Sequence, residues 1–170
     1  MKILKWLLLV AFVSGLVTVK GQSSIGLFAG YGSEAEEVSF GLNAEIFIIP
    51  RLSMVPSGAF YLPSKKDFDG GDVIRNFFEI NGDLHGYVAK EESVAFYLLL
   101  GINYMHEKVK FSPDPIFGPP VTKKGSDTGA NLGIGITFGE NDKSPRFFIE
   151  VKSSTSFEGQ IVFTGGFRFH

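Results

Sequence analysis

The chain ends in Gln160-Ile-Val-Phe-Thr-Gly-Gly-Phe-Arg-Phe-His170, the stretch that decides its fold. Phe163 and Phe167 share one parity, whereas Thr164 and Arg168 share the other. A period of two indicates a β-strand with one apolar face and one more polar face. Phenylalanine repeated along one face fits a strand that meets lipid rather than water.

The opposite end of the chain has the features of a secretory leader. Lysines precede a mostly apolar run over residues 6–19, and Val19 and Gly21 are small enough for the −3 and −1 positions of a cleavage site. We therefore predict a signal peptide over residues 1–21 and a single mature domain over residues 22–170. A retained anchor is the alternative, but the run is shorter than the ~20 residues that a spanning helix needs.

Composition excludes several classes of protein. The predicted leader holds three of the 16 Lys and Arg residues and none of the 18 Asp and Glu residues, so the mature part is acidic. Without a basic excess, nucleic acid is not an expected partner. The chain has no cysteine, so disulfides contribute nothing to its stability. Its 21 glycines and 18 phenylalanines suit a tightly packed sheet with a lipid-facing surface.

Alternation of apolar and polar residues predicts eight strands. They cover residues 24–31, 38–48, 52–61, 77–88, 93–104, 128–138, 146–153 and 160–170. Most are close to the 9–11 residues that a tilted strand needs to cross a membrane. Short polar connections alternate with longer ones, of which residues 63–76 and 106–127 are the longest. This alternation is typical of barrels with short periplasmic turns and longer outer loops. Pro56 leaves the register of the third strand open.

At this point the chain resembles the OmpA/OmpX-type eight-stranded outer-membrane β-barrel proteins. Besides the leader, the resemblance rests on Ile25-Gly-Leu-Phe-Ala-Gly-Tyr31, on residues 131–138 and on the ending Gly165-Gly-Phe-Arg-Phe169. It implies an all-β, eight-stranded antiparallel up-and-down transmembrane β-barrel over residues 22–170, in the outer membrane of a Gram-negative bacterium.

The same resemblance implies partners rather than a reaction. Outer-membrane lipid and lipopolysaccharide would surround the barrel, and an extracellular partner is possible. The barrel-assembly machinery would read a C-terminal signal at Phe167 and Phe169. We expect no cofactor, no metal site and no catalytic residue. The expected role is envelope integrity or adhesion and host contact, through the extracellular loops.

Charged residues gather on the parity predicted to face inward. They are Glu45, Glu79, Asp83, His85, Glu150, Lys152 and Arg168. An eight-stranded barrel is just wide enough for its own side chains to fill it, and buried charges must pair. We therefore predict a polar network that plugs the interior. Aromatic residues near the strand ends predict interfacial girdles: Tyr31, Tyr61, Tyr87, Tyr104 and Phe138.

One further patch and two rival functions remain open. Phe111, Ile116 and Phe117 lie in a proline-rich stretch that is a candidate contact patch on a loop. A secreted lipocalin-like barrel binding an apolar ligand would need apolar residues inside and polar residues outside. A lipid-modifying hydrolase would need a serine near a histidine at the lipid face. Its candidates are His85 and His106, with Ser93, Ser112 or Ser126.

Overall fold

The computed structural model describes residues 23–33, 36–68, 71–113, 119–139, 145–156 and 159–170, which leaves the predicted leader outside. The described residues form nine β-strands. These are β1 (Ser23–Gly32), β2 (Glu37–Ile49), β3 (Leu52–Tyr61), β4 (Ser64–Phe68), β5 (Gly71–Lys90), β6 (Val94–Pro113), β7 (Val121–Phe138), β8 (Arg146–Ser154) and β9 (Gln160–Phe169). They contain no helix long and apolar enough to span a membrane.

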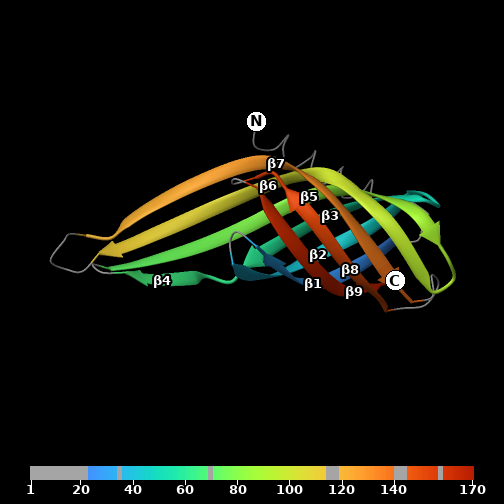
Figure 1. The fold of residues 1–170 in the computed structure, drawn as a ribbon, viewed down its shortest axis with the longest axis horizontal. Helices are drawn as coiled ribbons and strands as arrows, with labels where there is room; N and C mark the ends of the chain where they lie inside the picture. The colour runs from blue at the N-terminus through green and yellow to red at the C-terminus, as the bar shows by residue number, and fades with distance from the viewer. Residues whose placement is uncertain (1–22, 34–35, 69–70, 114–118, 140–144, 157–158) are drawn as a thin grey trace, which may run out of the picture.

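The sheet closes on itself into a ring of eight strands (Figure 1). Each strand pairs antiparallel with its neighbours, and the ring is completed where β1 pairs with β9 and β3 pairs with β5. The short β4 lies outside this ring, paired with β5 beyond the end of β3. The prediction of an eight-stranded antiparallel up-and-down barrel is confirmed.

Side-chain polarity in this barrel is the inverse of that in a water-soluble one. Leu98, Phe163 and Phe167 are about half exposed on the outer wall, whereas Glu45 and Glu150 are buried in the interior. Exposed apolar residues cover the wall all round: Ile25, Leu27, Phe40, Leu42, Phe60, Ile80, Leu84, Phe96, Leu100, Ile102, Leu132, Ile134, Ile149 and Phe169. An apolar band of this kind belongs in lipid, which argues against the lipocalin-like alternative.

Three strands are much longer than the sequence pattern predicts. β5 and β6 have 20 residues each and β7 has 18, about twice what is needed to cross the apolar band. Most of the predicted loops at residues 63–76 and 106–127 is therefore strand, and that part of the prediction was wrong. Beyond the membrane both faces of a sheet meet water, so apolar alternation no longer marks a strand.

These long strands extend the barrel at one end only. β4 and the ends of β5, β6 and β7 reach past the ends of β1, β2, β8 and β9 (Figure 1). We call this four-stranded part the protruding sheet. Ile25 pairs with Phe169 at the opposite end of the barrel, so the first and last strands begin and end there.

Pro56 and Gly135 each occupy a position in the sheet that suits their residue type. Pro56 pairs with Gly82 on β5. On the β2 side, the paired positions are interrupted between Asn43–Ser57 and Ile46–Met54, which is where Pro56 lies. The missing N–H of Pro56 thus falls in an interruption of the ladder. Gly135 of β7 lies against the Tyr97 ring, and a Cβ atom there would overlap that ring.

Replacing Leu100 by lysine should destabilise the barrel, because Leu100 is 60% exposed on the wall that meets lipid, in the middle of the apolar run of β6. The expected loss is roughly 2–4 kcal/mol of unfolding free energy near the bilayer midplane. It can be measured by denaturant unfolding in lipid vesicles, followed by circular dichroism and by mobility on unheated gels.

The matched control is Ser112→Lys, on the same strand and with the same parity but in the protruding sheet. It should change stability by less than about 0.5 kcal/mol. Equal losses for the two variants would contradict the placement of the apolar band.

Candidate functional site

One half of the barrel interior, toward the chain ends, is organised around Glu45. Arg146 donates to Glu45 Oε2 at 2.9 Å, and Ser53 donates to Oε1 at 3.0 Å. The Tyr87 hydroxyl also donates to Glu45. Arg168 Nη1 lies 3.5 Å from the same carboxylate. Four different strands thus supply partners to one fully buried acid.

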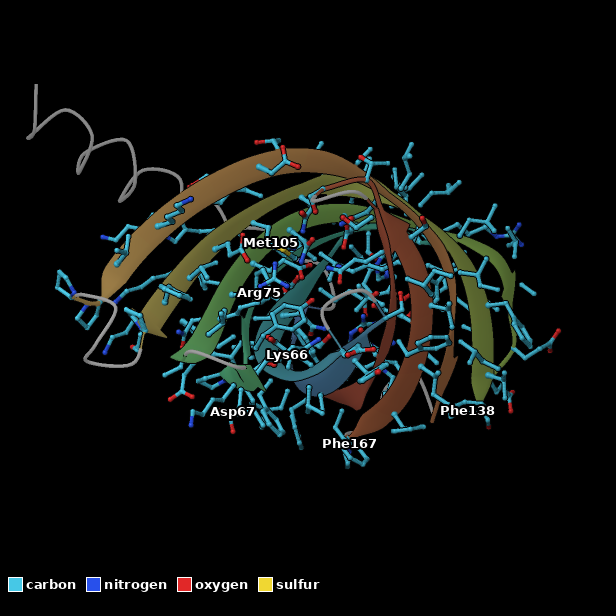
Figure 2. The ribbon with its side chains drawn as sticks, turned by 60° about the vertical axis from the view of Figure 1, so that its left-hand side comes forward. Lys66, Asp67, Arg75, Met105, Phe138 and Phe167 are labelled. Carbon is cyan, nitrogen blue, oxygen red and sulfur yellow. The ribbon has the colours of Figure 1, made fainter. Side chains whose placement is uncertain are left out.

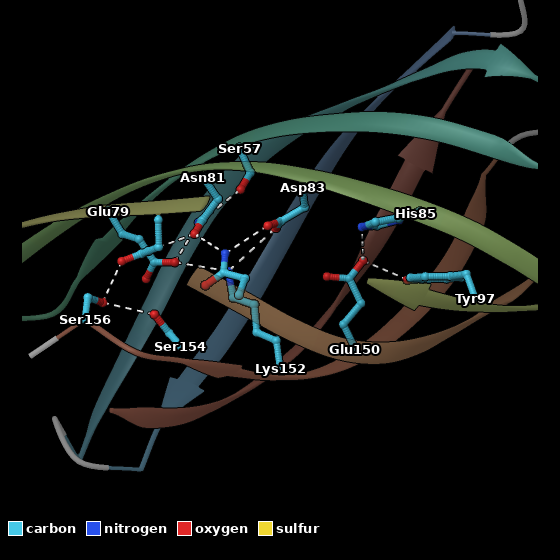
Figure 3. Close-up of polar contacts among 12 residues, drawn as sticks. Ser57, Glu79, Asn81, Asp83, His85, Tyr97, Glu150, Lys152, Ser154 and Ser156 are labelled. Carbon is cyan, nitrogen blue, oxygen red and sulfur yellow. Dashed lines mark hydrogen bonds and ion pairs between the residues drawn. The ribbon is translucent and has the colours of Figure 1, made fainter. Parts of the chain in front are cut away.

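Arg168 connects this acid to a second one, Glu150. Its Nη2 atom donates to Glu150 Oε1 at 3.0 Å, and its guanidinium lies 4.2 Å from the centroid of the Phe148 ring. Tyr97 donates to the same carboxylate oxygen at 2.7 Å. The His85 ring stacks on Tyr97 with its Nε2 atom 3.9 Å from Glu150 (Figure 3). Arg168 is therefore the cation that holds two carboxylates in this half.

The other half of the interior is organised around Lys152. Its ammonium lies 3.1 Å from Glu79 and 3.9 Å from Asp83 (Figure 3). Glu79 also accepts from Tyr61 and Asn81, each at 2.6 Å. Asparagines continue the network, because Asn81 accepts from both Asn103 and Asn131 at 2.8 Å. Each of these residues is at most 6% exposed.

The interior is therefore a packed polar plug. A cavity of about 20 Å³ lies among these side chains, which is space for about one water molecule. Four carboxylates face three permanent cations inside the ring. Buried charges without partners would cost several kcal/mol, so the observed pairing keeps the barrel interior stable.

All seven residues predicted for the polar network are buried inside the ring, each at most 8% exposed. The prediction omitted Arg146, which shares the inward parity of Phe148 and Glu150 and could have been found from it. It also misplaced Tyr61 and Tyr87, both 4% exposed and bonded to interior carboxylates. Both residues occupy inward-facing positions in the alternation of their strands, a signal that the prediction did not use.

The remaining aromatic residues predicted for the girdles do face outward. Tyr31 is 44% exposed, Tyr104 is 42% exposed and Phe138 is 37% exposed. Phe167 and Phe169 of the predicted assembly signal also lie on the outer wall, 49% and 45% exposed.

The structure brings together one of the predicted serine–histidine pairs. His106 Nδ1 lies 2.8 Å from Ser126 Oγ on the exposed face of β6 and β7. Ser126 also accepts from the Tyr104 hydroxyl at 3.1 Å. No carboxylate in the described part of the chain bonds to His106. His85, by contrast, is buried in the barrel interior.

Charges of the protruding sheet are partly paired. Lys65 lies 3.0 Å from Asp67 and 3.1 Å from Asp72, and Arg75 lies 2.8 Å from Glu107. Lys65, Asp67 and Asp72 are exposed, and Lys65 lowers the pKa of Asp67 through a hydrogen bond. Figure 2 labels two of these side chains, Asp67 on β4 and Arg75 on β5.

The predicted contact patch lies only partly within this sheet. Phe111 is on β6 and is half-buried, whereas Ile116 and Phe117 lie outside the described residues. The described residues contain no group of three or more His, Cys, Asp or Glu side chains that could hold a metal ion.

Glu37 is an unusual acid at the outer mouth of the barrel. It precedes Val38, which pairs with Tyr31 in the outermost exposed apolar pair of β1 and β2, so it lies outside the membrane-spanning part. Its side chain is 4% exposed. Burial raises the pKa of Glu37 to about 7, and the charge of Arg75 offsets only part of this effect.

These features define a class of protein. An antiparallel ring of eight strands with an apolar outer wall and a plugged polar interior is a transmembrane β-barrel of the outer-membrane type. Solved structures with the same fold include Ail, the attachment invasion locus protein of Yersinia pestis, at 19% identity and a TM-score of 0.57. The similarity covers 86% of this chain and 97% of that chain.

Two further structures share the fold. The N-terminal β-barrel domain of Pseudomonas aeruginosa OprF has 14% identity and a TM-score of 0.53, with 86% of this chain and 96% of that chain covered. Neisserial surface protein A has 11% identity and a TM-score of 0.57, with 86% and 93% covered. No family model matches the chain, and no curated protein matches it in sequence.

Replacing Arg168 by methionine should destabilise the barrel strongly, because Glu45 and Glu150 would lose the cation that they share. The expected loss is roughly 3–5 kcal/mol of unfolding free energy. The control is Arg51→Met in the exposed turn between β2 and β3, which should change stability little. Denaturant unfolding in lipid vesicles measures both, and comparable losses would contradict a paired interior.

Glu37 should make stability depend on pH. Its pKa rises from 4.5 to about 7 on folding, so between these values the folded protein binds more protons than the unfolded chain. Unfolding free energy should therefore fall as the pH rises through this window. We expect Glu37→Gln to remove this component. The unfolding free energy of the variant should therefore rise relative to that of the native protein between pH 5 and pH 8. A constant difference across that range would exclude the burial effect.

Proposed function

We propose that the protein is a small integral barrel of the bacterial outer membrane that acts in adhesion and host contact, or in envelope integrity, without catalysing a reaction. The protruding sheet is the observation that carries this proposal. A membrane anchor alone needs only strands that span the apolar band, whereas β5, β6 and β7 continue well beyond it. Such an ordered extension provides a surface on the cell exterior.

The contacts within the protruding sheet support a role in recognition. β5 and β6 remain paired up to Gly71–Pro113, and β6 and β7 up to Val121–Phe111. Cross-strand ion pairs such as Arg75–Glu107 hold the strands together. A surface ordered before a partner arrives loses less entropy on binding than a flexible loop does.

The interior supports a structural rather than a catalytic or conducting role. Its charged side chains bond to one another and leave room for about one water molecule. The exposed pair His106–Ser126 has no carboxylate partner in the described part of the chain to orient the imidazole, unlike the usual serine hydrolase arrangement.

The proposed partners follow from this setting. Outer-membrane lipid and lipopolysaccharide would contact the apolar wall, and the barrel-assembly machinery would read Phe167 and Phe169. An extracellular partner would bind the protruding sheet. Ail has been crystallised in complex with the heparin analogue sucrose octasulfate, at 21% identity to this chain. Sulfated glycans are therefore the first class of extracellular partner to test.

Shortening the protruding sheet tests the proposed function. The variant replaces residues 64–75 and 108–127 by short Gly-Asn-Gly turns, which leaves the membrane-spanning parts intact. We expect it to insert and to keep its heat-dependent gel mobility, while bacteria displaying it lose binding to host cells and to heparin-coated surfaces. The purified native protein should release no fatty acid from phospholipid or lipid A.

The control is the full-length chain carrying Arg51→Met, displayed at the same level. If the shortened barrel adheres to every surface as well as this control and protects the envelope equally, the protruding sheet has no such role.

A further inference from the structure

Three lysines that have no acidic partner among the described residues gather on the outward face of the protruding sheet. Lys108 and Lys124 are cross-strand partners on β6 and β7, and Lys110 follows at the next outward position. No carboxylate in the described part of the chain lies within 4.0 Å of any of these three ammonium groups. Like charges directly opposite one another destabilise a sheet. On β4, which is separated from β6 by β5, Lys65 is by contrast paired with two aspartates.

The register places this lysine pair just above the apolar band. Outward-facing pairs of β6 and β7 follow in order from Ile102–Ala130 through Tyr104–Thr128 and His106–Ser126 to Lys108–Lys124. Each step is about 6.8 Å along the strand. The lysines are thus two steps beyond the girdle residue Tyr104, at the height where lipid phosphates lie.

The next outward pair toward the membrane, His106–Ser126, can add a hydrogen-bond donor to the lysines. Tyr104 donates its hydroxyl hydrogen to Ser126 Oγ, so Ser126 can donate its own hydrogen to His106 Nδ1 at 2.8 Å. A neutral imidazole that accepts at Nδ1 carries its hydrogen at Nε2. In this tautomer His106 has a hydrogen-bond donor at Nε2, one outward step from the lysine pair.

An apolar track runs down the same strand. Outward residues of β7 continue from Ala130 to Leu132 and Ile134, which line a groove of about 460 Å³ together with Leu98, Val151 and Ile161. Leu132 is eight residues from Lys124, about 27 Å along the strand. At a tilt near 45° this is roughly 19 Å along the membrane normal, close to half the thickness of a bilayer.

We propose that this face of β6 and β7 binds a phosphorylated lipid of the outer leaflet, of the lipid A type. Lys108 and Lys124 hold its phosphate group, His106 and Lys110 contribute further contacts, and an acyl chain follows β7 toward the groove at Leu132. The phosphate removes the repulsion between the two lysines. This inference rests on the outer-membrane setting of the proposed function and names one lipid and its site.

The test compares Lys108→Gln/Lys124→Gln with the control Lys123→Gln. Lys123 is adjacent in sequence but has the opposite parity, so it faces the other side of the sheet. Full-length proteins are placed in phosphatidylcholine nanodiscs containing bis-phosphorylated lipid A or its dephosphorylated form. Native mass spectrometry then counts bound lipid A, and gel mobility verifies folding.

We expect the native protein and Lys123→Gln to retain phosphorylated lipid A, and the double variant to bind it roughly 30-fold more weakly. Without lipid A, the double variant should be at least as stable as the native protein, because the repulsion is gone.

Three results would overturn the inference. They are equal retention of phosphorylated and dephosphorylated lipid A, an equal loss with Lys123→Gln, and binding of sucrose octasulfate or inorganic phosphate that is as tight as that of lipid A and is lost in the double variant. Adhesion is measured separately. A shortened barrel that still adheres would therefore refute the proposed function, whereas lipid loss in the double variant would still support this site.

Discussion

The structure depends on one constraint, that every backbone N–H and C=O group in hydrocarbon must find a partner within the protein. A flat sheet of these strands would leave two open edges in lipid. The pairings β1–β9 and β3–β5 remove both edges, and the ring that results has an inside and an outside. Because the outside meets lipid, side chains of opposite polarity separate onto the two faces of every strand.

The polar interior is a consequence of this separation, and it limits what the barrel can do. Eight strands enclose too little space for a water-filled channel, so the inward side chains pack and pair with one another. Glu45 and Glu150 share Arg168, while Glu79 and Asp83 lie on either side of Lys152. A packed interior of this kind supports the fold, so interactions with partners are left to the exterior surfaces.

The same strands meet two solvents along their length, and β6 and β7 show the change clearly. Their outward residues pass from leucine and isoleucine through Tyr104 to His106 and Lys108. Hydrophobic burial in lipid stabilises the lower part, whereas cross-strand hydrogen bonds and ion pairs stabilise the part above it. Charges that have no partner in the sheet itself, such as Lys108 and Lys124, are the natural positions for contacts with other molecules.

By itself the sequence determined the strands that lie in lipid, since alternation there has a direct physical cause in the two environments that flank each strand. It predicted the bounds of the third strand, residues 52–61, and the inward parity of all seven charged residues of the plug. Only the tertiary structure decided what depends on the register between strands: the bonds from Tyr61 to Glu79 and from Tyr87 to Glu45, the bond from Arg146 to Glu45 and the pairing of Lys108 with Lys124. It also decided how far β5, β6 and β7 extend. Both faces of a sheet above the membrane meet water, and the added parts of β5 (residues 71–76) and β7 (residues 121–127) show no apolar alternation, whereas only a short stretch of β6 (residues 108–112) does.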